Sequence, residues 1–280
     1  MTQSPPSLDR EESQRIRAKR IETIAKYMLP LVVLLASLWL WDRIVTWNEI
    51  PHYILPGPDR VWDSLTNDWP ILYDAAKLTA RTTLMALVLA VIGGAGLAII
   101  FNQSKMIEMS FYPFAVILQV TPVVSIAPLI FIYVDSKIAG MLLCAWIVAF
   151  FPVLSSTTLG LNSVDHNLRD LFRIYGATRW QRLWVLELPS ALPYFLGGLK
   201  IAGGLSLIGA VVAELVAGTG GVGAGLAARI QEAGYRLNIA RMFAALSMIA
   251  AMGVVLFAAL SLLSHMLLHK WHESAVSRER

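Results

Sequence analysis

One stretch decides the fold of this 280-residue chain: Asp170-Leu171-Phe172-Arg173-Ile174-Tyr175-Gly176, followed after nine residues by Leu186-Glu187-Leu188-Pro189. It lies in a polar connection, residues 162–190, between two apolar runs that are each long enough to cross a membrane. A connection that only joins two spans needs no regular pattern. This one has an ordered spacing of apolar, charged and glycine residues, and that spacing predicts two short helices.

The first predicted helix has apolar residues at i, i+3, i+4 and i+7, namely Leu168, Leu171, Phe172 and Tyr175. Asp165 is placed to cap its start, because an aspartate oxygen can accept hydrogen bonds from the first free backbone amides. Gly176 is placed to end it, because glycine readily adopts the left-handed conformation at a helix end.

The second predicted helix begins at a capping box made by Thr178 and Gln181. Its apolar face would be Trp180, Leu183 and Trp184, and Pro189 would mark its end. Two capped helices suit a rigid docking element in the cytoplasm. They suit equally well a pair of helices lying on the membrane surface, with arginines at the headgroups and tryptophans at the interface. The residues alone leave both interpretations open.

Composition excludes a soluble protein. Hydrophobic residues make up 56% of the chain and charged residues 15%, with a mean hydropathy of +0.61; soluble domains carry about 25% charge. We therefore predict an all-α membrane protein with six transmembrane helices at residues 27–47, 78–101, 111–134, 138–161, 191–217 and 240–268. Only three residues separate the third and fourth, so a tight hairpin is expected there. The first run starts late, and no cleavable signal peptide is expected.

Positive charge predicts the orientation. The N-terminal tail, the second and fourth connections and the C-terminal tail carry 14 Lys and Arg residues, and the other connections carry six. Cytoplasmic loops are enriched in Lys and Arg, so both termini are expected in the cytoplasm. The chain thus divides into a basic tail (1–26), a six-span domain (27–268) containing the loop 162–190, and a short tail (269–280). A net charge of +4 is too small to indicate nucleic-acid binding.

Two ionisable residues lie inside the fifth predicted span, Lys200 and Glu214. They are 14 positions apart, about 21 Å along a helix, so they cannot pair with each other within it. Ionisable residues within a membrane mark functional sites by default. Each could line the pathway or a gate, or pair with a neighbouring span, or reach the interface.

The third predicted span contains Pro122 and Pro128, which remove backbone donors and are expected to kink it. Gln119, Thr121 and Ser125 add polar groups to the same stretch. Freed carbonyls are tolerated in a membrane where they face a cavity. These five residues are therefore candidates for the pathway or gate.

The sequence gives no support for ATP binding, dinucleotide binding, metal binding or catalysis by this chain. It has no GxxxxGK[ST] phosphate loop, and its one GxGxxG match (Gly218, Gly220, Gly223) follows a membrane span, where a flexible connection or a re-entrant turn is expected. His265, His269 and His272 share a helix face, but interfacial residues are expected there, so we predict no metal site. Cys144 is expected to be inert, and no catalytic set of side chains is evident.

The opening stretch resembles the EAA loop of binding-protein-dependent ABC importer permeases. That pattern reads Glu-Ala-Ala, three residues, Gly, nine residues, Ile, any residue, Leu-Pro, and the spacing matches throughout. Gly176, Leu188 and Pro189 match by identity, and Asp170 and Leu186 stand for the Glu and Ile. Leu171 and Phe172 depart from the two alanines. In such permeases this loop couples to the ATPase, which implies a coupling set of Arg169, Asp170, Leu171, Phe172, Arg173, Gly176, Leu188 and Pro189.

The resemblance extends to the nitrate/sulfonate/taurine branch of these permeases. The residues that carry it are Gln119 to Leu129, Phe151-Pro152, Gly160-Leu161, Ser163-Val164-Asp165, Gly198 to Ala202 and Ala213-Glu214. Thiamine-pyrimidine precursor and riboflavin importers have similar permeases, so such solutes are the alternative. The resemblance implies the type I importer fold, and a non-enzymatic subunit in a bacterial inner membrane without cofactors of its own.

The partners implied by the resemblance are two ATPase subunits that bind ATP and Mg, a second permease copy forming a homodimer, and a periplasmic or lipoprotein solute-binding protein. Two other classes remain as rivals on the residues. One is a secondary transporter that uses Lys200 or Glu214 as a proton relay. The other is a membrane scaffold without transport. No inverted repeat is evident, which argues against many secondary transporter folds.

Overall fold

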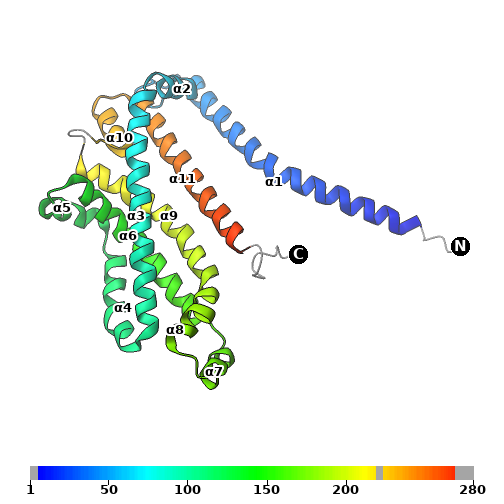
Figure 1. Ribbon diagram of the computed structural model, residues 1–280. Coiled ribbons are helices and arrows are strands. Elements are labelled where there is room, and N and C mark those ends of the chain that lie inside the picture. The colour runs from blue at the N-terminus through cyan, green and yellow to red at the C-terminus, as the bar shows by residue number, and fades with distance from the viewer. Residues whose placement is uncertain (1–5, 219–222, 269–280) are drawn as a thin grey trace. The chain divides into compact units, whose positions relative to one another are not determined.

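A computed structural model describes residues 6–218 and 223–268, and every regular element in these ranges is helical (Figure 1). The chain divides into two compact units, Met1–Asp63 and Ser64–Arg280. The first holds α1 (Pro6–Trp47) and the start of α2 (Pro58–Asn67). The apolar part of α1, Met28–Trp47, is the first predicted span, and the helix also runs through most of the predicted N-terminal tail.

The second unit is built around three long helices: α3 (Trp69–Gln103), α6 (Lys137–Asn162) and α9 (Leu188–Ala217). They pack against one another and enclose the largest apolar core, and α11 (Ile239–Leu268) covers α9 (Figure 1). Among the described residues, five helices are long and apolar enough to cross a membrane, or six if one bent pair counts as a single span. The predicted all-α class is confirmed.

Small residues bring α6 and α9 into close contact. A Cβ at Gly160 would lie 2.8 Å from the Cα of Ala191, and one at Gly209 would lie 2.7 Å from the Cα of Ala145. Close approach of this kind is how helices associate in lipid, where burial of apolar surface provides little net driving force. The α6–α9 pair is the most closely packed pair of helices in the second unit.

The third predicted span is not one straight helix. Its residues form α4 (Lys105–Val120) and α5 (Val123–Tyr133), which meet at an angle of 101°. The kink expected at Pro122 is confirmed, and the bent pair can count as one span. Only residues 134–136 separate α5 from α6, as the predicted tight connection requires. Proline disfavours helical backbone in the residue before it, and Thr121 is accordingly extended, with φ −73° and ψ 121°. Pro128 lies inside α5, which continues past it as a regular helix.

The second unit has two distinct ends. At one end, α6 leads through α7 (His166–Ile174), α8 (Arg179–Arg182) and a wide π-helical turn η1 (Leu183–Glu187) into α9. At the other end lies α10 (Leu226–Tyr235), packed against α3, α9 and α11 (Figure 1). The sequence did not predict α10, because its glycine-rich approach was interpreted as a flexible connection or a turn.

Candidate functional site

The helix α7 has the ends that the sequence predicted. The Asp165 carboxylate accepts a hydrogen bond from the Asn167 amide at 2.8 Å, and Gly176 has a positive φ of 67°. The Gly176 amide donates to the Arg173 carbonyl at 3.1 Å, closing the last turn. Both ends are therefore determined by local side-chain and backbone chemistry.

The second loop helix begins at the predicted capping box but does not end at Pro189. The Gln181 amide donates to Thr178 Oγ1 at 3.3 Å, and the Thr178 amide donates to Gln181 Oε1 at 2.8 Å. From Arg179 the chain stays helical through η1 and on to Ala217. Proline is tolerated in the first turn of an α-helix, and Pro189 lies there, directly after the π turn. The predicted end at Pro189 was wrong.

The loop exposes a mixed apolar and charged surface. Ile174 and Tyr175 are 81% and 82% exposed, and Leu171, Trp180 and Trp184 are also exposed. Asp170 and Arg173 lie on the same helix α7 and are exposed too. Leu183 is buried instead, so the predicted apolar face of Trp180, Leu183 and Trp184 is divided between bundle and surface. No residue of α7 is buried, which leaves the helix available to a partner.

Arginines attach this loop to the ends of two spans. Arg169 Nη2 donates to the carbonyl of Leu161, one residue before the end of α6, at 2.7 Å. Arg179 Nη1 donates to the carbonyl of Gln103, the last residue of α3, at 3.4 Å. Free carbonyls at a helix C-terminus carry partial negative charge, so a cation there is favourable.

A buried carboxylate lies where the loop joins α9. Glu187, in η1, is 1% exposed. Its Oε1 accepts from Arg182 Nε at 2.8 Å, and Oε2 accepts from the Nδ2 of Asn102 in α3. Arg169 Nε lies 3.9 Å from Oε1. Sequence reasoning missed Glu187, because Asn102 is 85 positions away in the chain.

The predicted coupling set therefore occupies two places. Arg169, Asp170, Leu171, Phe172 and Arg173 belong to α7, and Gly176 follows it. Leu188 and Pro189 begin α9 instead, where Leu188 packs against the main core. The first six shape the exposed loop, and the last two form its junction with the bundle.

The predicted pathway residues do not form one site. Gln119, Thr121 and Pro122 line a cavity of about 350 Å³ at the break between α4 and α5, which Pro152 of α6 and Leu205 of α9 also line. Thr121 Oγ1 donates to the Ile117 carbonyl at 2.7 Å, and the same carbonyl also accepts from the Thr121 amide at 3.1 Å. Ser125 and Pro128 lie outside this cavity, on an exposed part of α5.

Lys200 lies in a different place, a cavity of about 390 Å³ between α9 and α11. Ser261, Ser264 and His265 of α11 also line it. Lys200 and Gln119 therefore line two separate cavities.

Glu214 is buried at the end of the unit that holds α10. Its Oε2 accepts from the amide of Ala227, in the first turn of α10, at 3.0 Å. The adjacent amide of Leu226 donates to Oγ1 of Thr79 in α3 at 2.9 Å. These two side chains cap α10, since the first amides of a helix have no partner within it. The Glu214 carboxylate therefore binds the start of α10, a short helix that is not one of the predicted spans.

Among the described residues, the glycine motif, the histidines and Cys144 form no metal site or dinucleotide-binding loop. Gly218 and Gly223 have positive φ values of 73° and 104°, so they act as turn residues, and Gly220 lies outside the described residues. No group of three or more metal-ligating side chains occurs among the described residues; His269 and His272 lie outside them. Cys144 is buried.

Comparison with known proteins identifies the family. Residues 86–269 match the family described as "Binding-protein-dependent transport system inner membrane component". The chain belongs to this family. It is an ABC importer permease, as the EAA-like loop indicated, of the branch that the stretch Gln119 to Leu129 and the other motifs indicated. Members of the family are transport permease subunits.

Two relatives cover nearly the whole permease. The riboflavin transport system permease protein RibX of Chloroflexus aurantiacus is 31% identical over 270 residues, 91% of this chain and 96% of the relative. The taurine transport system permease protein TauC of Escherichia coli is 29% identical over 255 residues, 87% of this chain and 90% of the relative. The crystal structure of "an amino acid ABC transporter with histidines" shares the fold, with a TM-score of 0.59, 17% identity, and coverage of 74% and 97% of the two chains.

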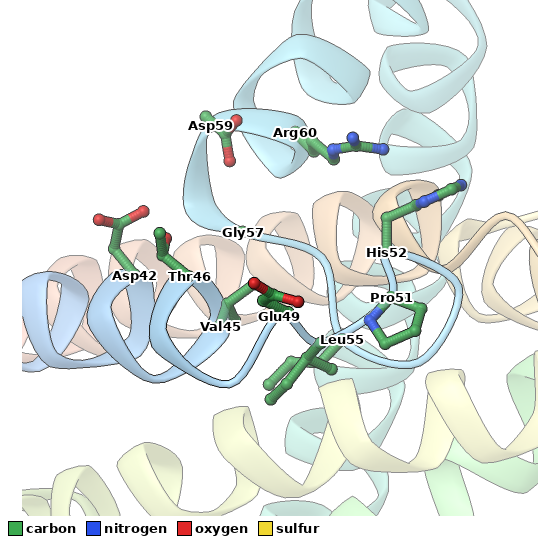
Figure 2. A pocket seen from close by; sticks show the side chains of 11 residues that line it. Asp42, Val45, Thr46, Glu49, Pro51, His52, Leu55, Gly57, Asp59 and Arg60 are labelled. Carbon is green, nitrogen blue, oxygen red and sulfur yellow. The ribbon is translucent and has the colours of Figure 1, made fainter.

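A pocket within the first unit of the permease was not foreseen by sequence reasoning (Figure 2). It has a volume of about 330 Å³ and lies where α1 leads into α2. Asp42 and Thr46 come from α1, Glu49 and His52 from the connection, and Arg60 from α2. Its polar lining contains none of the predicted site residues.

Proposed function

We propose that this permease moves a small polar organic or anionic solute, of the nitrate, sulfonate or taurine kind, into the cell at the expense of ATP hydrolysed by a separate subunit. The observation that carries the proposal is the capped α7–α8 loop. It exposes Ile174 and Tyr175 while Arg169 and Arg179 attach it to the ends of α6 and α3. A loop built this way can receive a force and pass it to the bundle.

The solute class has a second candidate, a riboflavin-like molecule or thiamine-pyrimidine precursor. The riboflavin permease matches this chain at 31% identity and the taurine permease at 29%, so similarity favours neither strongly. Purified solute-binding protein from the same gene neighbourhood, titrated with taurine, nitrate and riboflavin, decides between them. Binding of taurine or nitrate supports the first candidate, and binding of riboflavin alone supports the second.

The partners follow from the same reasoning. Two ATPase subunits would dock on the loops of two permease copies, with ATP and Mg bound in the ATPases, and a periplasmic or lipoprotein binding protein would deliver solute. The pair of copies would form a central pathway. Alternating access then requires that ATP binding favour one of two states of the pathway. No catalysis is assigned to this chain.

The orientation supported by the charge count places α7, α8 and both tails (1–26 and 269–280) in the cytoplasm of a bacterial inner membrane. Gln119, Thr121 and Pro122, which line one cavity, are the pathway residues we retain. The secondary-transporter rival is disfavoured, because the Glu214 carboxylate caps α10 and Lys200 lies in a separate cavity.

The proposal is tested by charge reversal on α7. We expect Asp170→Lys and Arg173→Glu each to lower solute uptake per ATP hydrolysed at least fivefold in a reconstituted importer, because both side chains are exposed on the docking helix. Lys105→Glu is the matched control, an exposed residue of α4 outside the loop. Uptake per ATP equal to that of the parent in both α7 variants would contradict the proposed docking surface.

A further inference from the structure

Glu187 carries a charge where an apolar residue would be expected. It faces the bundle from η1, four positions after the buried Leu183, and both are 1% exposed. Taking a carboxylate out of water is costly, and a buried ion pair is often no more stabilising than well-packed apolar side chains. An apolar side chain at position 187 would therefore join η1 to the bundle equally well. The position is also the one that the EAA-like pattern leaves unspecified.

The partners of Glu187 indicate what the charge does. Arg182 of α8 donates to Oε1 at 2.8 Å, Arg169 of α7 lies 3.9 Å from the same oxygen, and Asn102 near the end of α3 donates to Oε2. Two partners therefore come from the loop and one from a span. Arg169 also holds the Leu161 carbonyl of α6 at 2.7 Å. One carboxylate thus joins both loop helices to the ends of α3 and α6.

The joint lies on a π turn. Such turns are rare, and single π turns within helices are frequently found at functional sites. Here the turn lets one helical run continue from Arg179 to Ala217 while the chain passes from loop to span. A displacement of α7 or α8 must therefore pass either along this widened turn or through the side chains that bridge it.

We propose that Glu187 is a positioning residue for energy coupling. Its buried charge makes α7, α8 and the ends of α3 and α6 move as one body when the loop is displaced. The inference rests on the proposed function, because it requires that the loop receive force from an ATPase. Arg169 and Arg182 act through Glu187, and Asn102 passes the constraint to α3.

The test uses the complete importer in proteoliposomes and measures solute molecules taken up per ATP hydrolysed, with radiolabelled taurine or riboflavin, whichever the parent accumulates. Glu187→Gln has nearly the same shape but no charge, and we expect it to lower the ratio at least fivefold. Adding Arg182→Gln removes the cation that Glu187→Gln leaves without its carboxylate. We expect the ratio to stay at least fivefold lowered, because the link between the loop and α3 is still missing. Glu108→Gln is the control: it removes a half-buried carboxylate outside the loop, paired with Lys105 at 2.8 Å on α4, and should leave the ratio unchanged.

A parent-like ratio in Glu187→Gln would overturn the inference. A double variant with a parent-like ratio would overturn it too, since Glu187 would then do no more than neutralise Arg182. If Glu187→Gln does not assemble, Glu187→Asp keeps the charge but withdraws it by one methylene. It should lower the ratio at least twofold, and a parent-like ratio there would also overturn the inference. A parent complex that shows no ATP-dependent uptake refutes the proposed function instead.

Discussion

The carboxylate of Glu214 in α9 occupies the space that a Cβ at Gly225 would need. The glycine, directly before α10, lets the carboxylate reach the amide of Ala227. Thr79 of α3 binds the neighbouring amide of Leu226. Because Gly225 has no side chain, Glu214 of α9 and Thr79 of α3 can both accept hydrogen bonds from the first amides of α10.

Gly225→Ala is expected to destabilise the permease by about 1–3 kcal/mol, the usual cost of forcing extra atoms into a packed site. The thermal unfolding midpoint of the detergent-solubilised protein measures the effect. Gly96→Ala is the matched control, because nothing lies within 4 Å of its added Cβ; it should be neutral or slightly stabilising. Equal midpoints for the two variants would mean that the Glu214–Gly225 contact does not constrain α10.

Gly176 is required for its backbone conformation and not for lack of space. Its φ is 67°, yet nothing lies within 4 Å of an added Cβ. Asparagine tolerates this left-handed region and β-branched residues do not. Uptake per ATP should therefore fall several-fold in Gly176→Val and keep at least half its value in Gly176→Asn. If Asn were as damaging as Val, the surface of the added side chain and not the backbone would be responsible.

The pair of Asp68 and Arg241 should make stability depend on pH. Arg241 donates to both carboxylate oxygens of Asp68, at 2.8 and 2.7 Å, and these bonds lower the pKa of Asp68 below its usual 3.8. A carboxyl with a depressed folded pKa stabilises the fold above its unfolded pKa, and this contribution is lost as pH falls through the folded value. Asp68→Asn should cost about 1–3 kcal/mol at neutral pH. Unfolding midpoints at pH 7 and pH 3 should differ less in the variant; an unchanged pH dependence would contradict this account.

The orientation predicted by the charge count is tested with reporters. A reporter active only in the cytoplasm should function when fused after Arg280 or inserted within residues 163–182. One active only in the periplasm should function within residues 48–77. The reverse pattern would overturn the orientation and, with it, the assignment of the α7–α8 loop to the ATPase side.

Local chemistry made much of the loop predictable. Asp165, Thr178 and Gln181 act on amides within three residues, so their spacing alone identified both helix starts. The end predicted at Pro189 failed, because the π turn before it cannot be read from a proline rule. Hydropathy predicted the spans, and Pro122 predicted a kink in the third, but neither gave its angle of 101°. The kink expected at Pro128 did not form, because α5 continues past it.

Contacts between distant segments were beyond sequence reasoning. Glu187 meets Asn102 across 85 positions, and Leu226 meets Thr79 across 147. Each residue alone is unremarkable in the sequence. The helix formers from Leu226 to Ala233 and the Arg229–Glu232 pair could have indicated α10, but the glycines before it suggested a flexible segment.

The central claim is that ATP hydrolysed by a partner drives import through this chain. The measurement is solute uptake into liposomes that contain the chain with or without its ATPase and binding protein, with and without an imposed pH gradient. We expect uptake only with the ATPase and ATP, no response to the gradient, and at most slower uptake in Glu214→Gln. Gradient-driven uptake by the chain alone, abolished by Glu214→Gln, would contradict the account and support a proton-coupled transporter.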